Sequence, residues 1–216
     1  MVETLGGVSE HTLLSQTATR AQIERHCAEA RTHQLFGVCV SSQWVSRAAT
    51  VLAETGVRLV AVVGFPLGTS ASPVKAFECE YAIAQGAQEI DMVLPIGSLK
   101  AGDRYTVCED IRAVVQAAKG RPVKVILETA LLNDGEKRLA CALAEEAGAA
   151  FVKTSTGFGP GGATLEDVRL LREASGGRLG IKASGGIRTA AFARELLAAG
   201  ATRIGTSNGV ALVSEA

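Results

Sequence analysis

Residues 150–173 read AFVKTSTGFGPGGATLEDVRLLRE and contain every part of a strand–loop–helix unit. A short apolar run comes first, a glycine-rich loop follows, and Thr164 then precedes Leu165-Glu166-Asp167. A residue with a side-chain oxygen followed by acidic residues is typical of a helix start, because both interact favourably with the free N–H groups of the first turn. This segment therefore predicts one βα unit.

The same unit recurs along the whole chain. Segments such as 20–33 and 104–119 carry apolar residues at the three- and four-residue spacing of an amphipathic helix. The predicted strands are Val8–Thr12, Phe36–Val40, Arg58–Val63, Glu89–Val93, Val123–Leu127, Ala150–Thr154, Leu179–Ala183 and Thr202–Gly205. The first of them is short and polar, which makes it the weakest strand signal.

Eight strands that are each followed by a helix predict an α/β fold, a TIM (β/α)8 barrel, with residues 1–216 forming a single domain. An open doubly wound sheet is the alternative. No G-x-G-x-x-G opens a helix after the first strand, which disfavours that alternative.

The composition excludes several classes of protein. With 47% hydrophobic residues and 22 Lys+Arg against 22 Asp+Glu, the chain is unlike a disordered segment and lacks the basic excess of a nucleic-acid binder. The five cysteines form no C-x-x-C pair and have no zinc-ligand spacing, so we expect reduced, buried thiols. Residues 1–15 lack a basic signal-peptide start, and no apolar stretch is long enough to cross a membrane. We therefore expect a cytoplasmic protein with no nucleic-acid or membrane partner.

Four predicted strands contain a charged residue where a parallel sheet is normally apolar on both faces. These residues are Asp91, Lys124, Lys153 and Lys182. The alternation of side chains along a strand places them inside the barrel. A buried ammonium group is costly unless it is paired or neutral.

Two interpretations of these buried charges remain open at this point. The charges form a purely structural ion-pair network, or crowded cations lower one another's pKa until one lysine is a neutral amine at pH 7. A neutral amine is the nucleophile that forms a Schiff base with a carbonyl substrate. The residues alone do not choose among the three lysines.

Glycine-rich loops follow the last three predicted strands, at residues 154–162, 183–189 and 205–209. In a TIM barrel the loops at the carboxyl ends of the strands form the active site, and the last ones commonly bind phosphate through backbone N–H groups. We therefore expect a phosphorylated carbonyl compound as the substrate.

Five motifs resemble the deoxyribose-phosphate aldolase family. They are GFPLG at 64–68, EIDMV at 89–93, FVKTSTGF at 151–158, IKASGGIRT at 181–189 and RIGTS at 203–207, in that order, within a likeness that runs from about His11 to Val210. The resemblance implies a class I (Schiff-base) aldolase, an aldehyde-lyase of deoxyribonucleotide catabolism. It would reversibly cleave 2-deoxy-D-ribose 5-phosphate to acetaldehyde and D-glyceraldehyde 3-phosphate, without metal or cofactor and as a homodimer.

The resemblance also implies a role for individual residues. The family's Schiff-base lysine corresponds to Lys153. A second lysine, here Lys182, lowers the pKa of the first and relays protons together with the aspartate that corresponds to Asp91. The substrate and phosphate contacts correspond to Thr12, Gly157, Gly185, Gly186, Ser207 and Asn208.

Three positions depart from the family pattern: Glu10 replaces aspartate, Ser41-Ser42 replace Asn-Pro, and Asn208 replaces a serine. We expect these changes to affect affinity more than reaction type. Two alternative functions remain, a catalytically impaired sensor of sugar phosphates and a barrel aldolase or transaldolase for another phosphosugar.

The chain has three histidines, and Cys39 lies in the second predicted strand. We expect His26 and His33 to face solvent from a helix, and Cys39 to pack inertly near the site. His11 lies in the first strand, close enough to the site for a substrate contact to be considered.

Overall fold

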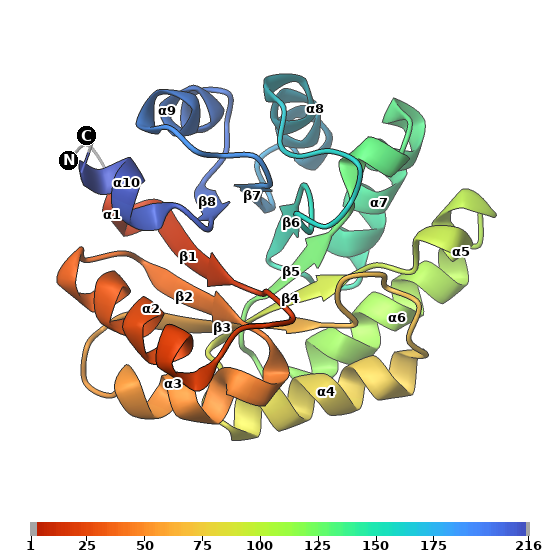
Figure 1. Ribbon diagram of the computed structural model, residues 1–216. Helices are drawn as coiled ribbons and strands as arrows, with labels where there is room; N and C mark the ends of the chain where they lie inside the picture. Colours follow the sequence, from red (N-terminus) through yellow and green to blue (C-terminus); the bar gives the residue numbers. More distant parts are fainter. Residues whose placement is uncertain (1–3, 215–216) are drawn as a thin grey trace.

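The computed structural model describes residues 4–214 and has eight parallel strands that close into a barrel in sequence order. Each strand pairs with the next, and β8 pairs with β1 to complete the ring. Figure 1 shows the helices arranged around this ring. The predicted TIM (β/α)8 fold is confirmed. Residues 1–3 and 215–216 of the predicted single domain lie outside the described residues.

Every predicted strand forms, and its bounds differ from the prediction by no more than one residue. The strands are β1 (Ser9–Leu13), β2 (Gly37–Val40), β3 (Arg58–Val63), β4 (Glu89–Val93), β5 (Val123–Ile126), β6 (Phe151–Lys153), β7 (Gly180–Ser184) and β8 (Arg203–Thr206). The main helices are α2 (Arg20–Thr32), α3 (Val45–Val51), α4 (Ser72–Ala84), α6 (Arg104–Ala117), α7 (Asp134–Glu146), α8 (Leu165–Ser175), α9 (Ala190–Ala198) and α10 (Gly209–Ser214). Shorter elements are α1 (Leu5–Val8), α5 (Ile96–Lys100) and the 3₁₀ turns η1 (Ser42–Trp44) and η2 (Thr129–Leu131).

Side-chain caps define several helix starts. The Thr164 side chain accepts a hydrogen bond from Asp167 N at 3.0 Å, as the opening segment predicts for α8. Thr19 with Gln22, at the start of α2, forms a reciprocal capping box that satisfies two otherwise free N–H groups.

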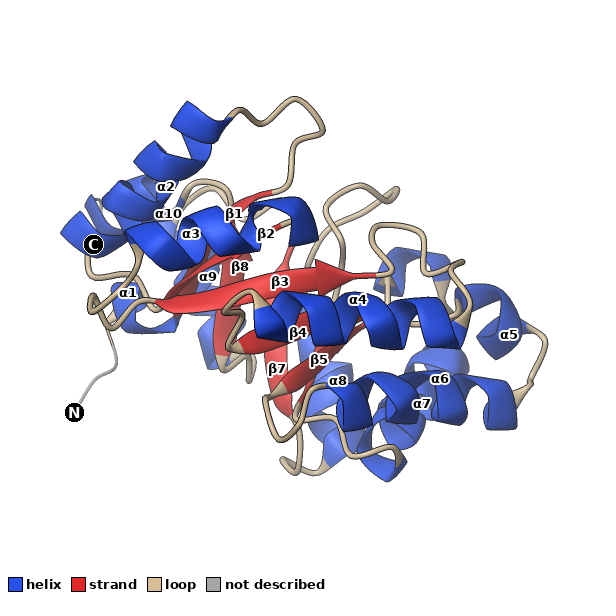
Figure 2. Cartoon of the chain, turned by 90° about the horizontal axis from the view of Figure 1, so that it is seen from below, coloured by secondary structure: helices blue, strands red, loops and turns tan. Residues whose placement is uncertain are grey.

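The strands separate an apolar layer from a charged interior. Outward side chains such as Ile90, Met92 and Ile181 are fully buried against the surrounding helices, where most of the core lies. Figure 2 shows α3 and α4 covering one side of the strands. The strand register places Asp91 beside Lys124, and Lys153 beside Lys182. Charged residues from different strands therefore meet inside the barrel.

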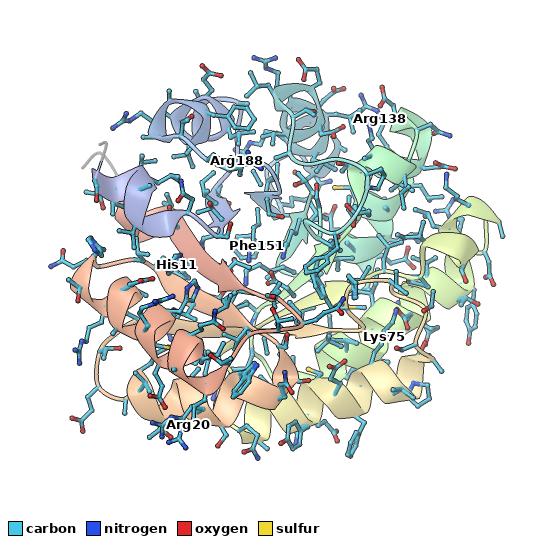
Figure 3. The ribbon with its side chains drawn as sticks, in the orientation of Figure 1. His11, Arg20, Lys75, Arg138, Phe151 and Arg188 are labelled. Atoms are coloured by element: carbon cyan, nitrogen blue, oxygen red, sulfur yellow. The ribbon has the colours of Figure 1, made fainter. Side chains whose placement is uncertain are left out.

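The expectation for His26 is wrong. The His26 ring is buried and stacks on the His11 ring, with centroids 3.5 Å apart, while His33 is half-buried at the end of α2. His11 Nε2 lies 3.1 Å from a carboxylate oxygen of Glu29 in α2. Both rings thus lie between β1 and α2, and Figure 3 shows His11 away from Phe151 at the barrel centre. His11 does not line the interior.

The buried His26 should make the fold sensitive to acid. Burial first, and the neighbouring His11 second, lower the pKa of His26 from 6.5 to about 3. Between these two pH values the unfolded chain binds a proton at His26 and the folded chain does not. The contribution of His26 to the free energy of unfolding is therefore fully present above pH 6.5 and is lost as the pH falls toward 3.

We expect the unfolding free energy to fall by about 2 kcal/mol between pH 6.5 and pH 5 through His26 alone. Urea unfolding at the two pH values measures this loss. His26→Phe keeps an aromatic ring on His11 but removes the titration, and it should remove most of that difference. An identical loss in wild type and variant would contradict the assignment.

Within residues 4–214, no helix combines the length and apolar character that a membrane crossing requires.

Candidate active site

The barrel interior contains a cluster of charged side chains contributed by six strands. Its members are Glu10 from β1, Glu89 and Asp91 from β4, Lys124 from β5, Lys153 from β6, Lys182 from β7 and Arg203 from β8. The cluster is almost completely removed from solvent. We refer to these seven residues as the interior cluster.

Asp91 lies at the centre of the interior cluster and connects its three lysines. Its Oδ1 accepts a hydrogen bond from Lys124 Nζ at 3.0 Å. Its Oδ2 accepts from both Lys153 Nζ at 2.8 Å and Lys182 Nζ at 2.6 Å. Lys153 and Lys182 therefore share one carboxylate oxygen, whereas Lys182 also donates to Glu10.

Arg203 closes the amino-terminal end of the interior. Its Nη1 lies 3.0 Å from Glu10 Oε1 and 3.4 Å from Glu89 Oε2. Its guanidinium carbon lies 3.4 Å from the ring centroid of Phe36 and 5.4 Å from that of Phe151. Stacking on two aromatic faces and pairing with two carboxylates together fix this side chain.

The charges of the interior cluster stabilise one another. Burial alone would raise the pKa of Asp91 and Glu10, but the ammonium groups around them outweigh burial and hold both pKa values below their ordinary range. Burial would likewise lower the pKa of Lys182, but the Asp91 and Glu10 carboxylates outweigh it and raise that pKa. The pKa of Lys124 is raised for the same reason. Lys124 and Lys182 are therefore held as cations.

The charge count differs from the one expected from sequence. Three lysines faced one aspartate in the sequence analysis, whereas the interior holds four cationic and three anionic side chains. Sequence reasoning did not place Glu10 or Arg203 inside. The alternation of side chains along each strand could have placed both residues inside the barrel. Glu10 shares a face of its strand with Thr12, and Arg203 shares one with Gly205.

A cavity of about 660 Å³ opens above the interior cluster, at the carboxyl ends of the strands. Lys153 is the one lysine of the interior cluster that lines it. Of the other residues singled out from the sequence, the cavity is lined by Thr12, Gly157, Gly185, Gly186 and Ser207. Asn208 does not line it, because its side-chain amide donates to Arg188 O at 2.9 Å.

Backbone N–H groups on the cavity wall suit an anion. Among the described residues, the N–H groups of Gly157, Gly185, Gly186 and Ser207 donate to no backbone oxygen of the loops. Gly185 and Gly186 have φ of +89° and +76°, which favours glycine and lets consecutive N–H groups converge. Arg188, which sequence reasoning did not single out, also lines the cavity and adds a positive charge.

Within residues 4–214, two groups of side chains have the composition of a metal site, and neither group is suited to bind a metal ion. Glu10, Cys39 and Asp91 lie close together, but Lys182 occupies both carboxylates, and burial raises the pKa of Cys39 to about 11. A protonated thiol is a poor ligand. The second group contains His11, His26 and Glu29. Stacked rings cannot both direct an in-plane nitrogen lone pair at one ion.

Besides Asn208, the other two departures from the family pattern also make specific contacts. Ser42 Oγ donates to Glu78 Oε1 at 3.0 Å, and Glu78 Oε2 accepts from Gly64 N at 2.9 Å. This glutamate of α4 therefore ties together the loops that follow β2 and β3. Glu10 reaches both Lys182 and Arg203.

Cys39 packs in a small apolar cluster with Leu14, Val60 and Val62.

Comparison with known proteins identifies the family. A sequence profile described as the DeoC/LacD family aldolase matches residues 7–214. The chain is 54% identical over 204 residues to a deoxyribose-phosphate aldolase of Bdellovibrio bacteriovorus, covering 94% of this chain and 93% of that protein. It is 55% identical over 204 residues to one from Streptococcus pneumoniae, with the same coverage of both chains.

A solved structure supports the same relationship. The deoxyribose phosphate aldolase from Aeropyrum pernix, described as a unique tetrameric structure, superimposes with a TM-score of 0.91 at 32% identity, covering 97% of this chain and 89% of that one. The barrel and the matches over nearly the full length agree with the resemblance drawn from the motifs. This chain is an enzyme of the DeoC/LacD aldolase family and belongs to its deoxyribose-phosphate aldolases.

Proposed function

We propose that this enzyme reversibly cleaves 2-deoxy-D-ribose 5-phosphate to acetaldehyde and D-glyceraldehyde 3-phosphate through a Schiff base on Lys153. The observation that carries this proposal is the position of Lys153, which alone among the lysines of the interior cluster lines the cavity while sharing Asp91 Oδ2 with Lys182. The names of the relatives support the choice of substrate.

Charge balance supports Lys153 as the neutral amine. The interior cluster has one more cationic than anionic side chain when all its lysines are protonated. Lys182 bonds to two carboxylates and Lys124 lies near three, whereas Lys153 has only a share of Asp91. Loss of the Lys153 proton leaves the buried charges balanced, which lowers their cost in a dry interior. The free amine then faces the substrate.

The reaction follows from that amine. Lys153 Nζ attacks the C1 aldehyde, and loss of water gives a protonated imine. A base removes the proton of the C3 hydroxyl, the C2–C3 bond breaks, and its electron pair moves into the enamine at C2. Glyceraldehyde 3-phosphate leaves, a proton adds to C2, and water hydrolyses the imine to release acetaldehyde and the free amine.

We assign the proton transfers to Asp91 and Lys182. Asp91 stays ionised because the Lys124 and Lys182 ammonium groups lie beside it, and Lys182 stays protonated because Glu10 and Asp91 hold it. An anionic acceptor and a cationic donor thus lie beside the reacting amine, and a bound water would connect them to the C3 hydroxyl.

The glycine loops that line the cavity would bind the phosphate group of the substrate. Backbone N–H groups of Gly157, Gly185, Gly186 and Ser207 would contact it, with Arg188 adding charge. Thr12 would contact a substrate hydroxyl. Asn208 would act through the Arg188 carbonyl, by fixing the loop.

Borohydride trapping tests the proposal. Incubation with acetaldehyde and borohydride, followed by peptide mass analysis, should give a two-carbon adduct on Lys153 that is missing when borohydride is omitted. Turnover of 2-deoxyribose 5-phosphate in the same preparation separates this enzyme from a sugar-phosphate sensor. Parallel assays with other phosphosugars separate it from an aldolase or transaldolase of different specificity. The absence of an adduct, or an adduct on Lys124 or Lys182, would overturn the assignment.

We also propose that the enzyme forms a homodimer through the outer face of α4. Val74, Phe77 and Tyr81 follow one another at helical spacing on that face and are 56%, 70% and 47% exposed. A row of large apolar side chains in water is typical of an interaction surface. Figure 2 shows α4 on the outside of the barrel.

Phe77→Glu should dissociate this dimer, because it would place two charges in a buried apolar contact. Analytical ultracentrifugation should show a shift from dimer to monomer, with Glu80→Lys as a charge-changing control on the same helix. A wild-type monomer, or a variant with unchanged mass, would contradict the proposed interface.

A further inference from the structure

Glu128 is a buried glutamate that the proposed reaction does not use. It follows β5, is only 3% exposed, and adopts a left-handed backbone conformation with φ of 55°. Among residues 4–214, no lysine, arginine or histidine nitrogen lies within 4 Å of its carboxylate. A buried carboxylate without a cation needs other strong hydrogen-bond donors.

Those donors come from the loop that follows Lys153. The Glu128 carboxylate accepts from Thr156 N at 3.3 Å and also from the Thr156 hydroxyl group. The Thr156 oxygen in turn accepts from Phe158 N at 3.0 Å. Glu128 therefore bonds to Thr156 at the start of the short turn that contains Gly157, and the Thr156 hydroxyl group connects it to Phe158 N at the other end. Gly157 lines the cavity.

Gly159 shows how closely the turn covers this carboxylate. A Cβ atom at Gly159 would lie 2.6 Å from the Glu128 carboxyl carbon. Gly159 does not have a positive φ, so an alanine there would be disfavoured by this contact and not by its backbone. The backbone at Gly159 thus packs directly against the Glu128 carboxylate, with no room for a side chain between them.

We infer that Glu128 is a positioning residue that holds the 156–159 turn so that Gly157 N–H faces the substrate phosphate, and that it thereby sets the preference for phosphorylated over unphosphorylated substrate. The inference rests on the phosphate site of the proposed function. Glu128 acts through Thr156 and touches no substrate. A fixed N–H group binds an anion better than a mobile one, because its conformational entropy is already lost when the protein folds and is not lost again on binding.

The test compares 2-deoxyribose 5-phosphate with 2-deoxyribose. In Glu128→Leu, kcat/KM for the phosphorylated sugar should fall about tenfold or more, mainly through KM, because a single charge-assisted contact network is lost. The kcat/KM for 2-deoxyribose should stay within about twofold of wild type, since the imine chemistry is untouched. Inorganic phosphate, as a competitive inhibitor of 2-deoxyribose 5-phosphate cleavage, should bind about tenfold more weakly to the variant.

Matched variants separate positioning from general stability. Glu128→Gln keeps an acceptor oxygen and should retain part of the preference, whereas Glu195→Gln on the exposed face of α9 should retain all of it. If Glu128→Leu fails to fold, Gly159→Ala provides a second route, because its methyl group would displace the carboxylate. Gly159→Ala should weaken phosphate recognition in wild type and have no added effect in a Glu128→Ala background.

Equal losses on both sugars, or an unchanged preference, would overturn the inference. A wild-type enzyme that does not prefer the phosphorylated sugar would overturn it as well. The borohydride adduct on Lys153 is independent of phosphate, so it shows whether the Schiff-base part of the proposed function fails at the same time.

Discussion

Lys153→Ala should lower the rate of 2-deoxyribose 5-phosphate cleavage by roughly four orders of magnitude, because no other amine of the interior cluster reaches the cavity. The variant should also lose the two-carbon adduct in the borohydride experiment. Its fold should survive, since the remaining cluster has three cations and three carboxylates. A coupled assay for glyceraldehyde 3-phosphate measures the loss.

Lys100→Ala is the matched control for that experiment. Lys100 is an exposed lysine of α5 that pairs with Glu136, far from the interior cluster in the fold. It should leave the rate unchanged. Full activity in Lys153→Ala would disprove the Schiff-base assignment, and so would an adduct that persists in the variant.

Lys182→Leu should lower the rate by about two to four orders of magnitude, because it removes both a proton donor and the balance of buried charge. Three carboxylates would then face Lys124 and Arg203 alone. Lys153 would have to keep its proton to restore the balance, which removes the nucleophile at neutral pH. The acid limb of the pH–rate profile should therefore move to higher pH.

Removal of one carboxylate should partly reverse this effect. In Lys182→Leu with Glu10→Gln, two cations face two carboxylates, and Lys153 can again be neutral. We expect the double variant to be about tenfold more active at pH 7 than Lys182→Leu. The reason is that a shift of the acid limb by one pH unit changes the fraction of free amine about tenfold. An unchanged pH profile in Lys182→Leu, or a double variant that is no better, would contradict charge balance as the controlling factor.

The sequence predicted the strands well because each charged residue still alternates with apolar ones. Asp91 between Ile90 and Met92 keeps the period of two, so the outward face stayed recognisable. Alternation also placed three lysines inside. It could not say that Lys153 lies at the cavity, because that depends on the register between strands, which offsets Lys153 from Lys124 along the barrel axis.

The prediction that His26 faces solvent was wrong for a different reason. It lies three residues after Ile23 and four before Ala30, both fully buried, so the helical period did favour an inward position. Its polarity favoured an exposed position, whereas in the fold its ring stacks on His11, which comes from another element. Contacts between distant segments are the information that a single sequence does not carry.

The interior cluster also joins the two ends of the chain. Glu10 bonds to Lys182 across 172 positions and to Arg203 across 193. A partly folded chain that lacks β7 and β8 would leave Glu10 and Asp91 buried without these cations, which opposes a stable open intermediate. Catalytic competence should therefore be the last property to return on refolding, after far-UV circular dichroism has recovered. The interior cluster includes residues from both strands that close the barrel, so the proposed site is complete only once β1 and β8 have paired.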